Sequence, residues 1–259
     1  MSVYEGRVPM HRDTSLPITM KQKGEAMVEL SYFEIDGAIG GNQDWFSNVV
    51  MHIGGCAAAA ACDSCIYFAK HFGNTGWYPF DVEHLTQEDY VRFSQMMKPY
   101  IKPRVGGVKN PEWFVEGFYR YLKDHFYPGR PVLRMEVVRG EASQDQAWEA
   151  LKSRIDQGLP VPFLLLRHQN REVFEDYIWH WFMVIGYEES KEDLLVQTAT
   201  YGEKKTFSFA ELWNTGFEER GGMVLYDLDF ENPDFLSRNP HKHSFRISCL
   251  PRFRVIQSF

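Results

Sequence analysis

The chain has 259 residues, of which 44% are hydrophobic and 15% aromatic, enough to bury the core of one large domain or of a domain with an appendage. Its formal net charge of -7 and pI near 5.7 give no electrostatic reason to expect nucleic acid or an acidic membrane as a partner. No apolar run approaches the ~20 residues of a spanning helix, and residues 1–30 lack the apolar core of a signal peptide. We therefore expect a cytoplasmic globular protein with no membrane and no nucleic-acid partner.

Helices are expected to dominate the first half, after a polar, irregular segment over residues 1–27 and a loosely alternating strand over residues 28–35. Capping residues, a proline at a helix start and glycines at helix ends set the expected limits. The helices expected on these signals run from about Cys56 to Phe72, from Thr86, from Asn110-Pro111, and from the capping box of Ser143 and Gln146 to Gly158.

The second half has a different texture, with short apolar or β-branched runs separated by charged turns, which predict strands. These runs cover residues 161–166, 179–186, 194–200 and 223–228. The charged segment 188–193 is typical of the tip of an antiparallel hairpin that joins the second and third runs. We therefore predict an α+β fold with N-terminal helices packed on a C-terminal antiparallel sheet. We expect one domain over residues 1–259, with a core of about 28–230 and extensions at 1–27 and 231–259.

Cys56 is the most distinctive residue, because Gly54 and Gly55 precede it and five alanines follow it. The glycines allow a sharp turn, and the orphan amides and positive dipole end of a helix lower a thiol's pKa. Such a setting can bring the pKa from ~8.5 down to roughly 3.5–7.5, which makes a thiolate nucleophile at neutral pH. The alternative is a buried free cysteine in a helix that packs tightly on its neighbour.

His180 is the histidine best placed to handle the proton of such a thiol, because it begins an apolar strand and lies between Trp179 and Trp181. Flanking indoles would exclude water, and a histidine on a rigid strand can deprotonate a cysteine and later protonate a leaving amine. The alternative is a core histidine whose ring is satisfied by a backbone carbonyl.

The order of these elements resembles the papain-like cysteine peptidase superfamily, nearest its bacteriocin-processing, double-glycine peptidase-like branch. The resemblance rests on a cysteine at a helix start, then Gly-Leu-Pro-Val at 158–161, His-Trp-Phe-Met-Val-Ile-Gly-Tyr at 180–187 and a strand ending at Gly202. It covers about residues 48–213. It implies a papain-like fold in which Cys56 is the nucleophile and His180 is the general base and acid.

The chain departs from the family pattern at the oxyanion donor. Papain-like enzymes carry a glutamine six residues before the cysteine, where this chain has Val50. Asn48 and Gln43 carry suitable amides on the preceding segment, and the Cys56 backbone N–H could serve as one donor with either of them.

A second departure concerns the residue that orients the histidine. The family has an aspartate or asparagine on the next strand, and alignment on Gly202 puts Thr198 at that position. The Thr198 hydroxyl or the Gln197 carbonyl can accept a hydrogen bond from the ring, but neither stabilises an imidazolium as an anion would.

The remaining signals predict no cofactor and no metal site. The C-x-x-C motif of Cys62 and Cys65 lies inside a helix, where no helix dipole activates it, and no second motif completes a zinc site. With so few cysteines in a long chain, we expect reduced thiols. His241 and His243 are best explained as a solvated turn, the alternative being a metal-binding pair on a strand.

From Arg238 onward the chain is basic and apolar, in contrast to its acidic body. We expect this tail to cover an otherwise exposed face or to form a subunit contact in a homo-oligomer.

The residues therefore favour a cysteine hydrolase that cleaves a peptide or a small amide through a thioester on Cys56. An acyltransferase would use the same thioester with an amine in place of water. From a different class, a catalytically inactive binding or scaffold protein is suggested by Val50 and by the absence of an acid at Thr198.

Overall fold

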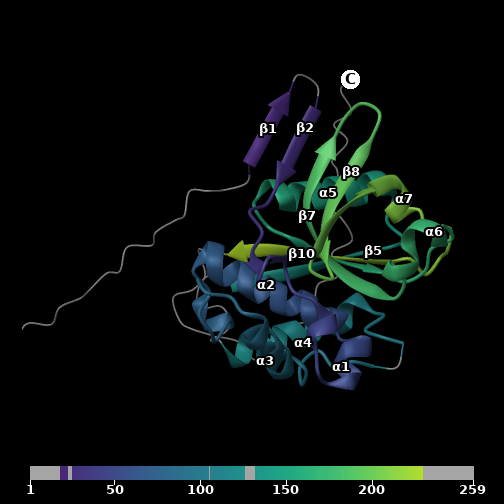
Figure 1. Cartoon of the computed structure of the whole chain (residues 1–259). Helices are drawn as coiled ribbons and strands as arrows, with labels where there is room; N and C mark the ends of the chain where they lie inside the picture. The colour runs from purple at the N-terminus through teal and green to yellow at the C-terminus, as the bar shows by residue number, and fades with distance from the viewer. Residues whose placement is uncertain (1–17, 23–24, 105, 126–131, 230–259) are drawn as a thin grey trace, which may run out of the picture.

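The computed structural model describes residues 18–22, 25–104, 106–125 and 132–229 (Figure 1). The predicted basic tail from Arg238, the pair His241 and His243, and most of both extensions lie outside this range. The prediction of a single domain stays a prediction.

An antiparallel sheet forms the centre of the fold, and every strand pairing in it is antiparallel. The strand order is β1-β2-β7-β6-β10-β5, with β8 on the free edge of β7 and β9 beyond it. The strands of this sheet are β1 (Ile18–Gln22), β2 (Glu25–Glu29), β5 (Val132–Arg139), β6 (Val161–Leu165), β7 (His180–Glu189), β8 (Leu194–Thr200), β9 (Glu203–Ser208) and β10 (Gly221–Asp229). A separate short pair joins β3 (Glu34–Ile35) and β4 (Ala38–Ile39).

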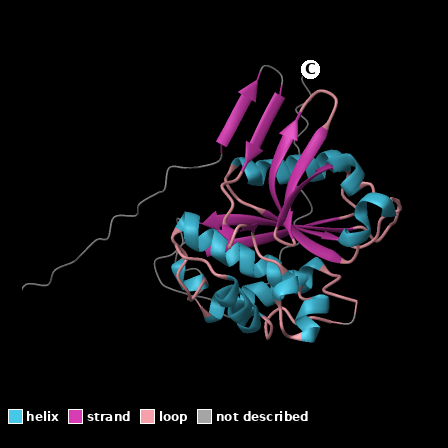
Figure 2. Cartoon of the chain, viewed as in Figure 1, coloured by secondary structure: helices cyan, strands magenta, loops and turns pink. Residues whose placement is uncertain are grey.

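Helices cover both faces of this sheet (Figures 1 and 2). They are α1 (Val49–Gly54), α2 (Cys56–Phe72), α3 (Gln87–Met97), α4 (Pro111–Asp124), α5 (Gln144–Asp156), α6 (Arg171–Phe174) and α7 (Phe209–Trp213). The group α1 to α4 lies on one face, where α2 packs on β7 and α4 on β10 and β5. On the other face α5 packs on β7 and β10, and α7 on β8 and β9.

The predicted α+β class and the antiparallel sheet are confirmed, but the division into a helical first half and a sheet-forming second half is too simple. Strands β1 and β2 come from the first half of the chain, and β5 lies at its middle between helices α4 and α5, yet all three join the same sheet. Helix α5 closes its second face. A sheet with apolar side chains on both faces needs helices on both faces. Helix α5, which lies between β5 and β6 in the chain, supplies the cover for the second face.

The helix limits predicted from capping residues are confirmed. The Thr86 side chain accepts from the Asp89 N–H, and Ser143 and Gln146 form the reciprocal capping box. Asn110 caps α4, with a proline in its first turn. Helix α2 ends where Gly73 turns left-handed at φ 66°. These limits were readable because each involves residues within a few positions of one another.

The single strand expected over residues 28–35 is wrong. Strand β2 ends at Glu29, and the chain leaves the sheet after the Leu30 N–H donates to the Ile185 carbonyl at 2.8 Å. Phe33 and Ile35 are buried beyond that point, so the alternation reflects a segment buried on one side and not a continuous strand. Strands β5 and β9 were not predicted, because both carry many charged residues.

The contact between α2 and β7 brings the two halves of the chain together. Four of the five alanines after Cys56 are buried in this helix, and β7 is buried from His180 to Tyr187. Small side chains let the helix backbone come close to the strand. The start of α2 thus lies beside the start of β7, where the candidate site is found.

Candidate active site

Cys56 is the first residue of α2, and Gly55 is the residue that caps this helix. The Gly55 carbonyl accepts from the Ala59 N–H at 2.8 Å, which starts the helical hydrogen bonding. A Cβ on Gly55 would lie 2.3 Å from the Met51 carbonyl oxygen, whereas one on Gly54 would have its nearest neighbour at 3.5 Å. The turn between α1 and α2 therefore requires glycine at position 55 but not at position 54.

The Cys56 thiol is held at the helix start as predicted, but its pKa is shifted in the opposite direction. Cys56 is only 5% exposed, and burial raises its pKa. The backbone N–H groups of Trp181, Ala57 and Cys56 itself act against this shift without reversing it. Burial in an apolar site disfavours the thiolate more than the helix amides favour it, so the resting group is a thiol.

His180 is the first residue of β7 and is 4% exposed. Its Nε2 lies 2.7 Å from the Thr200 Oγ1, and its Nδ1 lies 3.3 Å from the Tyr201 hydroxyl. The Tyr201 ring stacks on the imidazole with centroids 4.5 Å apart and an interplanar angle of 5°. Both ring nitrogens thus have side-chain partners, and no backbone carbonyl among the described residues satisfies the ring as the core-histidine alternative required.

Burial lowers the pKa of His180 to about 3. The ring is therefore neutral at physiological pH, and one nitrogen donates while the other accepts. In the tautomer that carries its proton on Nε2, the Nε2–H donates a hydrogen bond to Thr200 Oγ1, and Nδ1 accepts one from the Tyr201 hydroxyl. This is the tautomer that a general base acting through Nδ1 needs.

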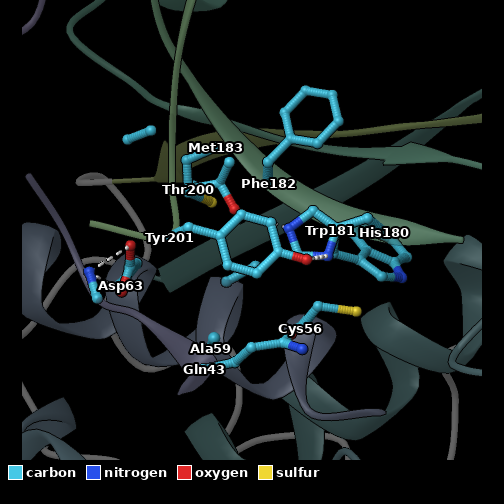
Figure 3. Close-up of a pocket in the computed structure, with 13 residues that line it drawn as sticks. Gln43, Cys56, Ala59, Asp63, His180, Trp181, Phe182, Met183, Thr200 and Tyr201 are labelled. Atoms are coloured by element: carbon cyan, nitrogen blue, oxygen red, sulfur yellow. Dashed lines mark hydrogen bonds between the residues drawn. The ribbon is translucent and has the colours of Figure 1, made fainter. Parts of the chain in front are cut away.

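Cys56 and His180 line one cavity, together with the side chains drawn in Figure 3. The other residues of its wall are Gly41, Gln43, Ala59, Ala60, Asp63, Trp181, Phe182, Met183, Ala199, Thr200 and Tyr201. The cavity holds about 20 Å³, which is room for one water. The fold thus places both predicted residues at the same cavity, although no hydrogen bond joins thiol to imidazole within the described part of the chain.

Thr198 does not orient His180. It is paired with Val184 across the sheet, and its hydroxyl donates to the Lys205 carbonyl at 3.2 Å. Val184 is four residues beyond His180, a distance of about 13 Å along a strand. Thr200 occupies the position expected for Thr198.

Asn48 does not reach the cavity either, because its side chain caps α1 and accepts from the Met51 N–H at 3.2 Å. Val50, at the position of the family's glutamine, is 54% exposed on the same helix. The side-chain amide at the cavity belongs to Gln43. Its Nε2 donates to the His52 carbonyl at 3.0 Å, and its Oε1 is buried with no hydrogen-bond partner in the described structure.

Asp63 is a buried carboxylate at the cavity that sequence reasoning passed over as part of the C-x-x-C motif. It accepts hydrogen bonds from the Tyr90 hydroxyl at 2.7 Å, the Tyr32 hydroxyl at 3.1 Å and the Gly41 N–H at 3.2 Å. Burial raises its pKa to about 6, although these hydrogen bonds act in the opposite direction. Asp63 thereby ties the loop that carries Gln43 to α2 and α3.

The cysteines inside α2 show no sign of redox pairing. Cys62 and Cys65 are buried, and burial raises the pKa of each thiol well above its usual value. Both are free, as is Cys56. Cys249 lies outside the described residues.

Only one of the two indoles beside His180 encloses the cavity. Trp181 is buried in its wall and donates its indole N–H to the Val108 carbonyl at 2.6 Å. Trp179 is 39% exposed and lines a separate cavity of about 330 Å³. The backbone explains the difference, because Trp179 has a left-handed φ of 59° and lies just before the strand begins.

None of the helices in the described ranges combines the length and hydrophobicity needed to cross a bilayer. Comparison of the chain with protein-family models, with curated proteins and with solved structures finds no match. What the site can do must therefore be argued from its own geometry.

Proposed function

We propose that the protein is a cysteine hydrolase of the papain-like kind, acting on the amide bond of a peptide or a small amide. The observation that carries the proposal is a thiol at a helix start and a neutral imidazole at one cavity, with Thr200 at Nε2 of the ring. A nucleophile, a base and a group that orients the base are the parts that covalent amide hydrolysis needs.

The reaction would begin with proton transfer from the Cys56 sulfur to His180 as the sulfur attacks the carbonyl carbon. The C–N bond then breaks, and the leaving amine takes the proton from the imidazolium, which leaves a thioester on Cys56. Water attacks the thioester with His180 again as base, and the thiol is released together with a carboxylic acid. His180 therefore gives up each proton that it accepts, and the cycle ends with a free thiol and a neutral imidazole.

The oxyanion of the tetrahedral intermediate would receive two hydrogen bonds. One comes from the Cys56 backbone N–H, which is an orphan donor at the helix start. The other comes from Gln43, whose Nε2 uses one hydrogen on His52 and has a second to give. Gln43 takes the role that Asn48 was expected to fill.

The resting pair is neutral, because burial raises the pKa of Cys56 and lowers that of His180. Thr200 and Tyr201 are uncharged, so neither hydrogen-bond partner of the ring supplies an anion that would stabilise an imidazolium. We therefore expect turnover to be slower than in an enzyme whose histidine is hydrogen-bonded to a carboxylate.

A second candidate function is a non-catalytic binding or scaffold protein. The specific observation in its favour is the cavity volume of about 20 Å³, which leaves no room for an amide beside Cys56. A neutral, buried thiol and histidine are also what a core without catalysis would contain.

Trapping of an acyl-enzyme decides between the two. The protein is incubated with an activated ester such as p-nitrophenyl acetate, and intact mass and peptide mapping locate the acyl group. We expect acylation of Cys56 that is absent in Cys56→Ala and strongly slowed in His180→Gln. Cys62→Ala is the matched control, because this cysteine lies in the same helix and away from the cavity. We expect it to acylate like the wild type.

Acylation that persists in Cys56→Ala, or that does not depend on His180, would sink the hydrolase proposal in favour of the binding protein. Adding an amine to the acylated protein then separates hydrolysis from acyl transfer. If amide product exceeds the free acid, the acceptor is an amine and the protein is an acyltransferase.

A further inference from the structure

Tyr201 has a backbone conformation that tyrosine disfavours. Only Tyr201 and Gly202 separate β8 from β9, and their φ angles are 52° and 75°. A two-residue hairpin turn with both φ angles positive favours Asn-Gly, because a Cβ is strained there. Such strain at a non-glycine residue persists only where the surroundings hold it in place.

The surroundings hold this turn at two places. The Asn42 side chain donates to the Tyr201 carbonyl at 3.1 Å, and the Ile39 N–H donates to the Gly202 carbonyl at 2.8 Å. Both bonds go to the main chain and would serve any residue at position 201. What the tyrosine side chain adds is its contact with His180, a parallel stack and a hydroxyl at Nδ1.

Tyr201 also lines the cavity, and it differs from the rest of the wall in how easily it can move. Trp181, Phe182 and Met183 form a wall of fully buried strand residues that cannot move without disrupting the core. Tyr201 is half-buried and lies on a hairpin turn, so its side chain can swing out at little cost to the core. Figure 3 shows its ring beside the imidazole and its hydroxyl joined to a ring nitrogen, with the Cys56 sulfur at the same space.

We propose that Tyr201 is a gate that covers His180 and occupies its Nδ1 in the resting protein, and that it swings away to admit substrate between Cys56 and His180. The gate rests on the proposed function, because its opening frees Nδ1, the nitrogen of His180 that would take the thiol proton. The gate also explains why the cavity is too small for an amide, because the structure then represents the closed, resting form. The apparent reactivity of the site is then limited by the fraction of molecules in which Tyr201 is open.

The gate is tested by the rate at which N-ethylmaleimide alkylates Cys56 at a fixed pH, followed by peptide mass spectrometry. Tyr201→Asn removes the ring and keeps a residue that tolerates the left-handed turn. We expect it to raise the alkylation rate of Cys56 about tenfold or more, because the site is then always open. Cys62 and Cys65 should stay unlabelled, which reports that α2 is still folded.

Tyr201→Phe separates the covering of His180 by the tyrosine ring from the hydrogen bond of the hydroxyl to Nδ1. It keeps the stacked ring, so we expect alkylation close to the wild-type rate, while the ¹⁵N chemical shift of the His180 Nδ1 changes as the hydroxyl is lost. Tyr177→Phe is the matched control, because Tyr177 also packs against the His180 ring, with centroids 6.4 Å apart, and gives it no hydrogen bond. It should change neither quantity.

A wild-type alkylation rate in Tyr201→Asn, with the protein folded, overturns the gate. So does a Tyr201→Phe variant whose Nδ1 shift matches the wild type. Neither readout requires turnover, so a failure of the gate is distinct from a failure of the hydrolase. Acylation of Cys56 with no effect of Tyr201→Asn leaves the hydrolase and removes the gate, whereas faster alkylation without acylation leaves a gated but non-catalytic thiol.

Discussion

The orientation of His180 depends on one hydroxyl from the neighbouring strand. Strands β7 and β8 pair Met183 with Ala199, which brings Thr200 diagonally across from the start of β7. The Thr200 Oγ1 is 2.7 Å from Nε2, a short distance for a neutral pair. An acceptor at Nε2 keeps the proton there, and Nδ1 is left to take the proton of a thiol.

At this scale we predict that Thr200→Val slows acylation of Cys56 roughly tenfold or more, a part of the ~10²–10⁴ that general base catalysis contributes. Valine keeps the β-branched shape and removes only the oxygen that bonds to the ring. The measurement is the rate of acyl-enzyme formation by intact mass. Thr198→Val is the control and should acylate like the wild type, because Thr198 bonds to Lys205 and lies opposite Val184. Equal losses in the two variants would contradict this assignment.

At the scale of elements, the site depends on the junction of α1 and α2. Helix α1 ends at Gly54, Gly55 makes the turn, and Cys56 begins the next helix. The sharpness of this turn exposes the first amides of α2 to the cavity and keeps the thiol among them. The constraint comes from the Met51 carbonyl, which leaves no space for a Cβ on Gly55.

The two glycines of this junction offer a matched pair of substitutions. We predict that Gly55→Ala lowers the free energy of unfolding by about 1–3 kcal/mol, because the new methyl overpacks against the Met51 carbonyl. Gly54→Ala should change it by less than about 1 kcal/mol, since its Cβ meets only ordinary contacts and alanine favours a helix. Urea unfolding followed by circular dichroism measures both. A cost as large for Gly54→Ala as for Gly55→Ala would disprove the steric explanation.

At the scale of the whole molecule, the sheet and its two helical layers bury ionisable groups that would be charged in water. His180 is kept neutral between β7, β8 and α2, and Asp63 is enclosed by residues from α2, α3 and the loop at Gly41. In each case burial disfavours the charged form. The stability of the fold should therefore depend on pH in a way that can be traced to single residues.

For His180 we predict a loss of stability as the pH falls from about 6.5 toward 3. In this range the unfolded chain binds a proton that the folded one does not, because the folded pKa is about 3 and the ordinary value is 6.5. The difference amounts to at most about 5 kcal/mol. His180→Gln should remove this part of the pH dependence, as measured by urea unfolding across the range.

Asp63 should make the stability depend on pH in the opposite direction, which provides an internal check. Its pKa is raised from 3.8 to about 6, so the unfolded chain loses its proton first and stability falls as the pH rises through this interval. Asp63→Asn should therefore flatten a decrease with rising pH, where His180→Gln flattens an increase. Variants that shift the curve in the same direction would show that burial does not set both pKa values.

Some of the site could be predicted before the fold was known. Cys56 stands out because glycines and alanines surround it, and His180 because it starts an apolar strand. Each of these signals lies within one short segment. Gln43 could be named as a candidate beside Asn48, but only the fold shows which of the two amides lies at the cavity. Thr200 carries no local signal, because its partner lies on another strand and the β7–β8 register contains a shift between Val184 and Gly186.

The sequence by itself determined the helix limits, the hairpin between β7 and β8, the antiparallel α+β class and the helix-start position of Cys56. Capping, turn chemistry and alternation act within a few residues, so they can be read along the chain. Only the tertiary structure decided the direction of the Cys56 pKa shift, the partner of His180 and the stacking of Tyr201 on its ring. These depend on burial and on contacts between strands and helices that are distant in sequence, and burial outweighed the helix-start amides that the sequence made visible.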